Sequence, residues 1–459
     1  MNEALRDLAG YVSKLSWDNV PEKVRKVTKF CTLDSVAAAV GATGDQQLDR
    51  VTALYQKISG VSADASIWYS AASPTKMSAP VAAFLNAMAG HTLELDDVHT
   101  GSKTHIGIVV IPAAWALAER LGSSGKDLLL AILCGYEATA RIGEGFGVSS
   151  HRNRGWHATS TAGTFGAAAA CAKLLKLNED QTLSAFGLAG TQSCGLWAFL
   201  EDGSSNKVLH PARAAASGME SALLASAGMT GPEHILCAKD GGLFPAMSDE
   251  YDYSLVNKDL GTKFQIEFVD NKPYPCCRST HMSIDAALAL RKEFGITVDD
   301  VESVEVRTYL VGHKQCGASD TSIFPQKPIE AKFSTPYTVA AALIYGEMTL
   351  RQFLPEEIGN KEVQALLRKV TSVPDDKFTE RYPSQWGCEM RLTKKDGTVL
   401  DKEIADASGS VKNPLTEEQL RAKALGLLRE GCPKRAESIM DEILFMDASQ
   451  DLPIISDEA

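Results

Sequence analysis

Residues 90–119 read GHTLELDDVHTGSKTHIGIVVIPAAWALAE, and this stretch indicates both the fold and a place for chemistry. An alanine-rich run with helical spacing leads into it, and an apolar run that we expect to be a helix opened by Pro112 follows. Between the two runs lie three carboxylates, Glu94, Asp96 and Asp97, followed by two histidines, His99 and His105. Carboxylates and imidazoles between two packed helices can hold a histidine in one tautomer with a pKa near neutrality. The stretch therefore predicts packed helices with an acid–base site in the loop that joins them.

The length and composition describe a globular protein with more than one core. At 459 residues the chain is longer than one ordinary domain, which favours two. No apolar run is long enough to span a bilayer, and the net charge of −12 argues against general nucleic-acid binding. The ten cysteines include no CxxC pair, so neither a zinc ribbon nor a disulfide framework is indicated. We therefore expect a cytoplasmic protein without membrane or nucleic-acid partners.

Helical periodicity with many small residues dominates the chain from 1 to about 265. The expected helices include 79–90, 109–121, 126–142, 161–176 and 211–228. Their alanines and glycines let helix axes approach closely. A further helix is expected at 414–430, where Thr416 and Gln419 suit a capping box.

The segment between these helical parts has a different texture. Apolar and polar residues alternate in VESVEVRTY (301–309), as in a half-buried strand. The segment CEMRLTKKDGTVLDKEI (388–404) is typical of a hairpin that turns at Asp396-Gly397, and 330–345 is expected to be a helix. We therefore predict a mainly α fold with two domains. A large all-helical domain is formed by both chain ends, 1–265 and 405–459, and a smaller α+β domain, 266–404, is inserted between them.

Eight collinear segments make the chain resemble the MmgE/PrpD family. They are LDSVAAAVGA, LELDDVH…THIG…VIPAAWALAE, GWHATSTAGTFGAAAACAKLLKL, NKVLHPARAAASG, GMTGP, KPYPCCRSTH, EAKFSTPYTVAAAL and VKNPLTEEQL. The family includes 2-methylcitrate dehydratases, cis-aconitate decarboxylases and iminodisuccinate epimerases. The resemblance runs over nearly the whole length and implies a large helical domain with a smaller α+β lid, usually paired as a homodimer.

The resemblance also implies a type of reaction. Family substrates are small di- or tricarboxylates such as 2-methylcitrate or cis-aconitate, and the shared step moves a proton beside a carboxylate. No metal or organic cofactor is implied. The protein itself must then supply cations that hold the carboxylates and an acid–base group, for which histidine needs little tuning. We therefore expect a cofactor-independent lyase, either a dehydratase or a decarboxylase.

Three residues are expected to be catalytic. His105 matches a site histidine of the decarboxylase branch and follows the acidic cluster. His157, in GWHATS, precedes a helix expected near Thr161, whose free N–H groups would attract a carboxylate. Lys207 matches the family's lysine ahead of a small-residue helix. Without the resemblance, His157 would more commonly be a hydrogen-bonded structural residue, and Lys207 could be solvated.

The residues expected to bind substrate are Glu94, Asp97, Lys272, Arg278, His281 and Tyr337. Arg278 lies within KPYPCCRSTH, where it could clamp a carboxylate or pair with a neighbouring acid. Tyr337 matches a pocket tyrosine of the decarboxylase branch, although it could be a packing residue. Asp97 could equally end a helix and bind loop amides. The residues read as structural are His99, His210, His234, His313, Cys276 and Cys277.

Several positions depart from the family pattern. Glu94 stands where the decarboxylases carry an aspartate, and the loop from Asp97 to His105 is one residue longer. Lys103 adds a cation inside this loop. Further differences are Ile106, where a proline is usual, and Pro211, where a glycine is common. The shape of the pocket is therefore expected to differ from that of the methylcitrate and aconitate enzymes.

Two other functions fit the same residues. An isomerase of the iminodisuccinate epimerase type would use bases on opposite faces, such as His105 with Lys207 or His157. A non-catalytic or metal-binding relative would use His99, His105 and Asp97 as ligands. Proton exchange with deuterated solvent would identify the first, and elemental analysis would identify the second.

Overall fold

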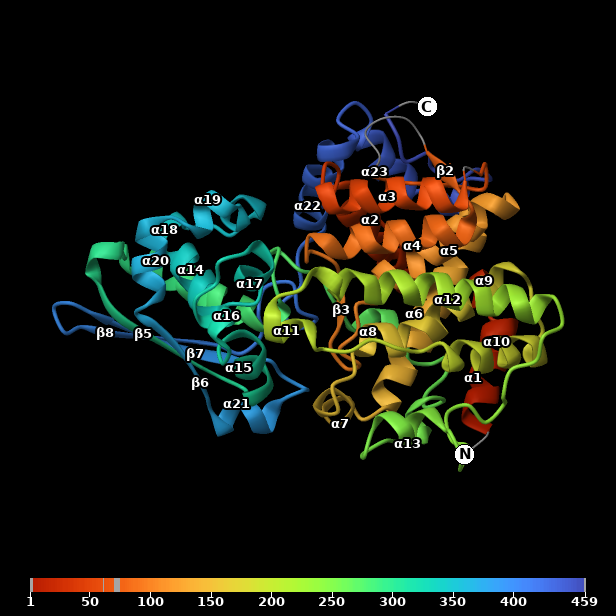
Figure 1. The fold of residues 1–459 in the computed structure, drawn as a ribbon, viewed down its shortest axis with the longest axis horizontal. Coiled ribbons are helices and arrows are strands. Elements are labelled where there is room, and N and C mark those ends of the chain that lie inside the picture. The colour runs from red at the N-terminus through yellow and green to blue at the C-terminus, as the bar shows by residue number, and fades with distance from the viewer. Residues whose placement is uncertain (1–2, 61, 70–74, 458–459) are drawn as a thin grey trace.

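Helices dominate the computed structural model, which describes residues 3–60, 62–69 and 75–457 (Figure 1). The predicted mainly α fold is therefore confirmed. The helices of the first part are α1 (Glu3–Lys14), α2 (Glu22–Val40), α3 (Gln46–Ser59), α4 (Ala79–Thr92), α5 (Gly107–Leu121), α6 (Gly125–Gly145), α7 (Val148–Asn153), α8 (Ala158–Thr161), α9 (Gly163–Leu174), α10 (Glu179–Thr191), α11 (Phe199–Asp202), α12 (Leu209–Ser226) and α13 (Leu243–Met247). Among the described residues, no helix is long and apolar enough to cross a membrane.

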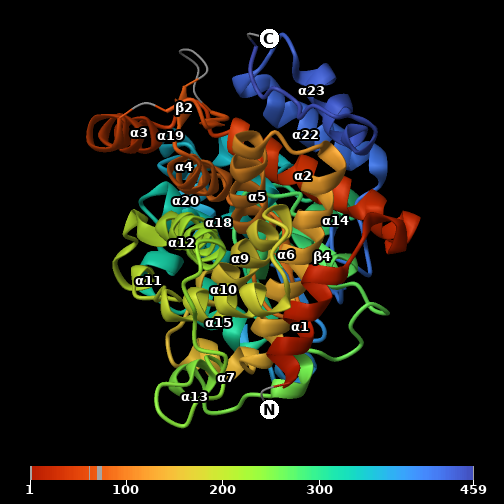
Figure 2. The ribbon, with the colours of Figure 1, turned by 90° about the vertical axis from the view of Figure 1, so that its right-hand side faces the viewer.

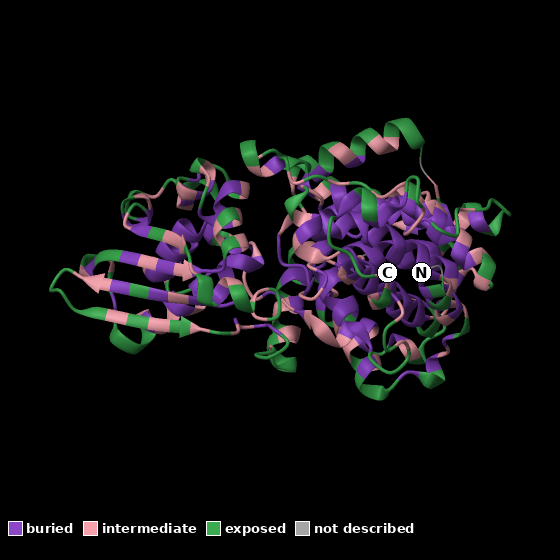
Figure 3. Ribbon diagram, turned by 90° about the horizontal axis from the view of Figure 1, so that it is seen from below, coloured by how far each residue is buried: buried purple, intermediate pink, exposed green. Residues whose placement is uncertain are grey.

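The larger hydrophobic core contains residues from both ends of the chain. Helices α4, α5, α6, α9 and α12 pack against one another, and Figure 3 shows buried residues concentrated within this part. An added Cβ at Gly166 of α9 would lie 2.8 Å from the carbonyl oxygen of Gly135 on α6. A larger side chain there would force the two helices apart, so the glycine permits the close packing expected from the sequence.

Two C-terminal helices complete this core. These are α22 (Glu417–Gly431) and α23 (Ala436–Leu444), and both pack on α2 (Figure 2). The predicted capping box of α22 is present, with Thr416 and Gln419 each bonding the other's backbone N–H. From α22, the Lys423 ammonium donates to Asp34 of α2 at 2.6 Å and to the Leu95 carbonyl at 2.7 Å. The end of the chain therefore contacts the loop that follows α4.

A second hydrophobic core surrounds a four-stranded sheet. The strand order is β6 (Val370–Pro374), β5 (Val301–Thr308), β7 (Cys388–Lys394) and β8 (Val399–Ile404). Strand β5 is parallel to β6 and antiparallel to β7, with Val306 opposite Met390. The register shifts between Val301 and Ser303, which brings Val301, Val304 and Val306 all into the core despite their uneven spacing.

Helices cover this sheet and lead to and from it. They are α14 (His281–Phe294), α15 (Leu310–Cys316), α16 (Asp320–Ile323), α17 (Pro328–Lys332), α18 (Thr335–Tyr345), α19 (Pro355–Ile358), α20 (Lys361–Leu367) and α21 (Asp376–Arg381). The domain boundaries near 265 and 405 stay a prediction, which the division of the buried residues into two cores supports.

The predicted turn is present, but two expected helix boundaries are wrong. The β7–β8 hairpin turns as predicted, with the Asp396 carboxylate accepting from the Thr398 N–H. The helix expected at 330–345 is instead two helices, α17 and α18, because Ser334 caps a new start by accepting from the Tyr337 N–H. The helix expected at 161–176 corresponds to α9, Gly163–Leu174, and the short α8 precedes it.

The sequence predicts that Pro112 opens its helix, but the residue lies inside α5. Proline inside a helix removes one backbone hydrogen bond and usually distorts the helix. Here the residue is buried in the larger core, where packing on every side of α5 offsets that cost.

Candidate active site

A cavity lies between the two cores. Its lining includes Glu94 and His105 from the loop region between α4 and α5, and Lys272, Arg278 and Tyr382 from the second half of the chain. The cationic lining residues are Lys103, Arg152, Lys207, Lys272 and Arg278. Glu94 is the one carboxylate among the lining residues that the structure describes. This acidic protein therefore contains a cavity suited to an anionic ligand.

A short antiparallel pair brings the two parts of the chain together at this cavity. Strand β3 (Val98–His99) pairs with β4 (Val269–Asp270), with Val98 opposite Asp270. The Asp270 carboxylate then holds Arg278 through Nε at 3.0 Å and Nη2 at 3.0 Å. Arg278 thus pairs with a neighbouring acid and also lines the cavity, so both roles considered from the sequence are compatible.

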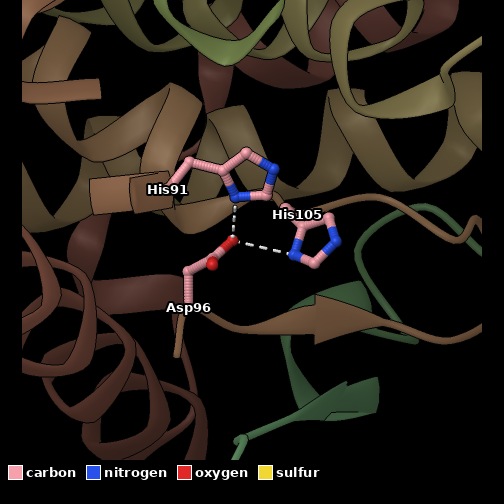
Figure 4. A group of neighbouring side chains, drawn as sticks. All are labelled: His91, Asp96 and His105. Atoms are coloured by element: carbon pink, nitrogen blue, oxygen red, sulfur yellow. Dashed lines mark hydrogen bonds and ion pairs between the residues drawn. The ribbon is translucent and has the colours of Figure 1, made fainter. Parts of the chain in front are cut away.

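Asp96 joins two histidines (Figure 4). Its Oδ2 accepts from the Nδ1 of His91 at 2.9 Å and from the Nδ1 of His105 at 2.8 Å. Burial alone would raise the pKa of Asp96, but the two imidazoles outweigh that effect and hold its pKa well below the usual value. Asp96 is therefore an ionised carboxylate that orients both rings.

The surroundings of His105 determine its tautomer. Its Nδ1 contacts two acceptors, the Asp96 carboxylate and the Asp97 carbonyl at 2.9 Å, so Nδ1 carries the hydrogen. The neutral ring then has its lone pair on Nε2. Burial lowers the pKa of His105 to about 4, although Asp96 acts in the opposite direction. At neutral pH, His105 is therefore an uncharged base with a defined accepting atom.

Glu94 holds two lysines beside Asp96 and His105. Lys207 donates to Glu94 Oε1 and also, at 2.7 Å, to His91 Nε2, while Lys272 lies 3.2 Å from Glu94 Oε2. Burial acts to raise the pKa of Glu94, but Lys207 and Lys272 outweigh it and lower the pKa below its usual value. Burial likewise opposes the charged form of Lys272, yet Glu94 and Asp96 raise its pKa above normal. The cavity wall therefore keeps charged ammonium groups in place before any ligand binds.

His157 faces a second histidine from α12. The two Nδ1 atoms of His157 and His210 lie 2.8 Å apart, so one ring donates and the other accepts. Burial, and then the neighbouring His210, lower the pKa of His157 well below its usual value. The His157 ring also packs against Trp197, with ring centroids 4.6 Å apart and ring planes inclined by 58°. Its Nε2 can accept or donate a proton, depending on which ring of the pair carries the shared hydrogen.

Three predicted substrate-binding residues lie outside the cavity lining. Asp97 accepts from the Tyr136 hydroxyl at 2.6 Å and from the Gly107 N–H at 3.0 Å, which fixes the start of α5. Its pKa is raised to about 7 by burial. His281 contacts the Cys276 carbonyl at 3.3 Å, and the Tyr337 hydroxyl donates to a backbone carbonyl in the second core. Their binding of substrate stays a prediction, and their present contacts are structural.

The structure also places residues in the site that sequence reasoning missed. His91 lies at the end of α4 and links Asp96 to Lys207. Arg152, from α7, lines the cavity beside Lys103. His91 stands within the polar stretch that indicated the site, five residues before Asp96, so its proximity was a usable signal. Arg152 had no such signal.

One group of described residues has the composition of a metal site. His91, Asp96 and His105 offer one ligand atom each within 4.8 Å. Both histidines direct an Nδ1–H at the same carboxylate oxygen, so an ion would have to displace two hydrogens. The ligand set considered from the sequence is not assembled, because His99 bonds Ser102 and the Asp97 carboxylate bonds Tyr136.

Comparison with known proteins places the chain in a family. The model of the MmgE/PrpD N-terminal domain matches residues 6–256, and that of the C-terminal domain matches residues 274–445. The chain therefore belongs to the MmgE/PrpD family, as its motifs indicated. The second match extends past the sheet into α22 and α23, which pack in the larger core.

Several relatives share nearly the whole length. The cis-aconitate decarboxylase-like protein oryM of Aspergillus oryzae is 27% identical over 97% of this chain and 95% of its own. The cis-aconitate decarboxylase of Mus musculus is 27% identical over 99% of this chain and 93% of its own. The 2-methylcitrate dehydratase of Cupriavidus necator is 25% identical over 57% of this chain and 54% of its own.

Proposed function

We propose that this protein is a cofactor-independent lyase, a dehydratase or decarboxylase, that acts on a small di- or tricarboxylate such as cis-aconitate or 2-methylcitrate. The observation that carries the proposal is the pairing of His105, a neutral base oriented by Asp96, with the ammonium groups of Lys207 and Lys272 in one cavity. The names of the family relatives support the same chemistry.

The cations act on the substrate's carboxylates. Arg278 has a buried Nη1 without a protein partner, which suits a carboxylate oxygen. Lys207 and Lys272 stabilise negative charge that develops on a carboxylate when the adjacent carbon loses a proton or carbon dioxide. Glu94 fixes both ammonium groups before the reaction, so little reorganisation is needed as charge develops.

Proton transfer is assigned to the two histidines that line the cavity. In a dehydration, the anionic substrate favours uptake of a proton from solvent by His157. His105 Nε2 takes the proton beside a carboxylate, the electron pair moves to form the double bond, and the departing hydroxyl takes the proton from the His157 imidazolium. In a decarboxylation, the carbon–carbon bond breaks, carbon dioxide leaves, and the carbon that keeps the electron pair takes a proton from a cavity histidine that has been protonated from solvent in the same way. Because His105 is neutral without substrate, proton removal is the step for which it is prepared.

The direct test is proton NMR in deuterated buffer with a panel of carboxylates that includes cis-aconitate and 2-methylcitrate. Wild-type protein should convert a member of the panel, and His105→Gln or His157→Gln should reduce turnover roughly 10²–10⁴-fold. His313→Gln is the matched control, because His313 lies on α15 outside the cavity lining and contacts Ser372. Full turnover by both site variants would contradict the assignment.

An epimerase is the second candidate, because two neutral imidazoles, His105 and His157, reach one cavity from different segments. Such an enzyme would exchange an α-proton for deuterium without water or carbon dioxide loss. A metal-binding relative is the third, because His91, Asp96 and His105 lie within ligand reach of one another. Elemental analysis of the purified protein would find stoichiometric metal in that case and none in the proposed enzyme.

We also propose that the protein is a cytoplasmic homodimer and that its second core closes over the first when substrate binds. The family resemblance supports the dimer, and the position of the cavity between the cores supports closure. Light scattering would measure the oligomeric state. Limited proteolysis with and without a dicarboxylate should show protection on binding, and equal digestion would contradict closure.

A further inference from the structure

We propose that Lys103 and Arg152 form a separate anion subsite in this cavity, which takes a substrate carboxylate that Lys207, Lys272 and Arg278 do not hold. The inference rests on the proposed carboxylate chemistry and assigns specificity to two residues that the proposed reaction leaves unused. It makes the third carboxylate of a tricarboxylate the group that this protein recognises at Lys103 and Arg152.

Lys103 and Arg152 lack counter-ions in the described structure. In the described parts of the chain, no carboxylate lies within 4.0 Å of Lys103 or Arg152, whereas Glu94 pairs with Lys207 and Lys272. The Nζ of Lys103 and the Nε of Arg152 are also buried without a hydrogen-bond partner. Burying a cationic donor without a partner is costly, so an anionic ligand would remove a penalty already present in the free protein.

The side chains of Lys103 and Arg152 converge on one cavity, which both residues line. Burial and then the Arg152 charge lower the pKa of the Lys103 ammonium to about 7, so a bound carboxylate would favour its charged form. The Lys103 Nζ lies 3.8 Å from the centre of the Tyr382 ring, and the Arg152 Cζ lies 4.4 Å from that of Trp197. The aromatic faces hold both cations at the cavity wall without neutralising them.

The loop between β3 and α5 holds Lys103 in a specific place. The His99 N–H donates to the Thr104 carbonyl at 2.8 Å, so Lys103 stands in a closed turn between β3 and α5. Lys103 adopts a left-handed backbone with φ of 56°, and Glu94, another lining residue, does so with φ of 58°. Side chains other than glycine rarely adopt this conformation, and such strain concentrates where it positions functional groups. This turn belongs to the loop in which the sequence departs from the decarboxylases.

The experiment compares two ligands by isothermal titration calorimetry. Tricarballylate carries three carboxylates, and glutarate has the same five-carbon chain with only the two terminal ones. Wild-type protein should bind tricarballylate at least tenfold more tightly than glutarate. Lys103→Met and Arg152→Met should each weaken tricarballylate binding roughly ten- to hundredfold, as expected for loss of a charge-assisted hydrogen bond, and change glutarate binding less than threefold.

The controls separate this subsite from folding and from the proposed reaction. Methionine keeps the unbranched shape over the aromatic rings, unchanged glutarate binding reports an intact cavity, and Lys239→Met removes an exposed lysine outside the lining. Unchanged tricarballylate binding in both site variants, or equal losses for the two ligands, would overturn the subsite. If the protein binds tricarballylate more tightly than glutarate but turns over no carboxylate, the proposed lyase is overturned and the subsite is supported. If it turns over a carboxylate but binds the two ligands equally, the subsite is overturned and the lyase is supported.

Discussion

Replacing Asp96 by asparagine tests whether one buried charge organises the acid–base site. The carboxylate accepts two hydrogen bonds, from His91 and His105, at 2.9 and 2.8 Å. A hydrogen bond to a charged group contributes about 1 kcal/mol more than a neutral one. The two bonds together therefore lose about 2 kcal/mol of orienting free energy, which is about 30-fold in the population of the productive arrangement. We expect Asp96→Asn to lower kcat/KM by at least that factor while the protein stays folded.

Two measurements check this expectation. Turnover assays give the loss in kcat/KM, and nitrogen–proton NMR of the imidazoles reports whether the hydrogen of His105 has moved from Nδ1 to Nε2. Asp285→Asn is the matched control, because that carboxylate also accepts two hydrogen bonds, from Tyr274 and from the Ser408 N–H, but lies outside the cavity lining. Turnover by Asp96→Asn within threefold of wild type, with unchanged tautomer signals, would refute the role of the charge.

Four further outcomes are expected. Lys207→Met should reduce turnover at least 100-fold, comparable with losing an oxyanion donor, and steady-state kinetics would detect it. The melting temperature should fall progressively as pH falls from about 6.5 to 4. In this range histidines are protonated in the unfolded chain, whereas the buried histidines of the folded protein stay neutral because their pKa values are lowered. The histidines concerned, with folded pKa values of about 4, are His99, His105 and His210. A chelator should leave turnover and melting temperature unchanged, and a decrease in either quantity would support the metal-binding alternative. Cys276→Ala should retain turnover in the same assay, because burial raises the pKa of this thiol to about 12 and keeps it protonated.

Sequence reasoning predicted the parts of the fold that depend on local signals. The hairpin at Asp396-Gly397 and the capping box at Thr416 and Gln419 are set by residues a few positions apart, and both are present. Pro112 was misplaced because packing around α5 outweighs the usual preference of proline for the first turn of a helix. The sequence predicts simple alternation in β5, but the buried positions are unevenly spaced. A register shift between Val301 and Ser303 accounts for this spacing.

The site was predictable where a short motif carries the residue, and less so where distant segments meet. His105, His157, Lys207 and Lys272 stand in family motifs, and all four line the cavity. Arg152 joins the cavity only when the chain folds, and Lys103 and Tyr382, which line the same cavity, are far away along the chain. Residue spacing in the sequence does not predict such contacts between distant segments. The same limit applies to His157, whose partner His210 was read as a separate structural residue.

The bond from Lys423 to the Leu95 carbonyl has a consequence for biosynthesis. Leu95 lies between Glu94 and Asp96, so α22 braces the very turn that presents the charged groups of the cavity. That helix is synthesised more than three hundred residues after the turn that it braces. Until α22 has been made, the turn at Leu95 lacks this brace and the larger core lacks the packing of α22. Premature termination before α22 would therefore remove both the packing and the brace, leaving a chain without an assembled site.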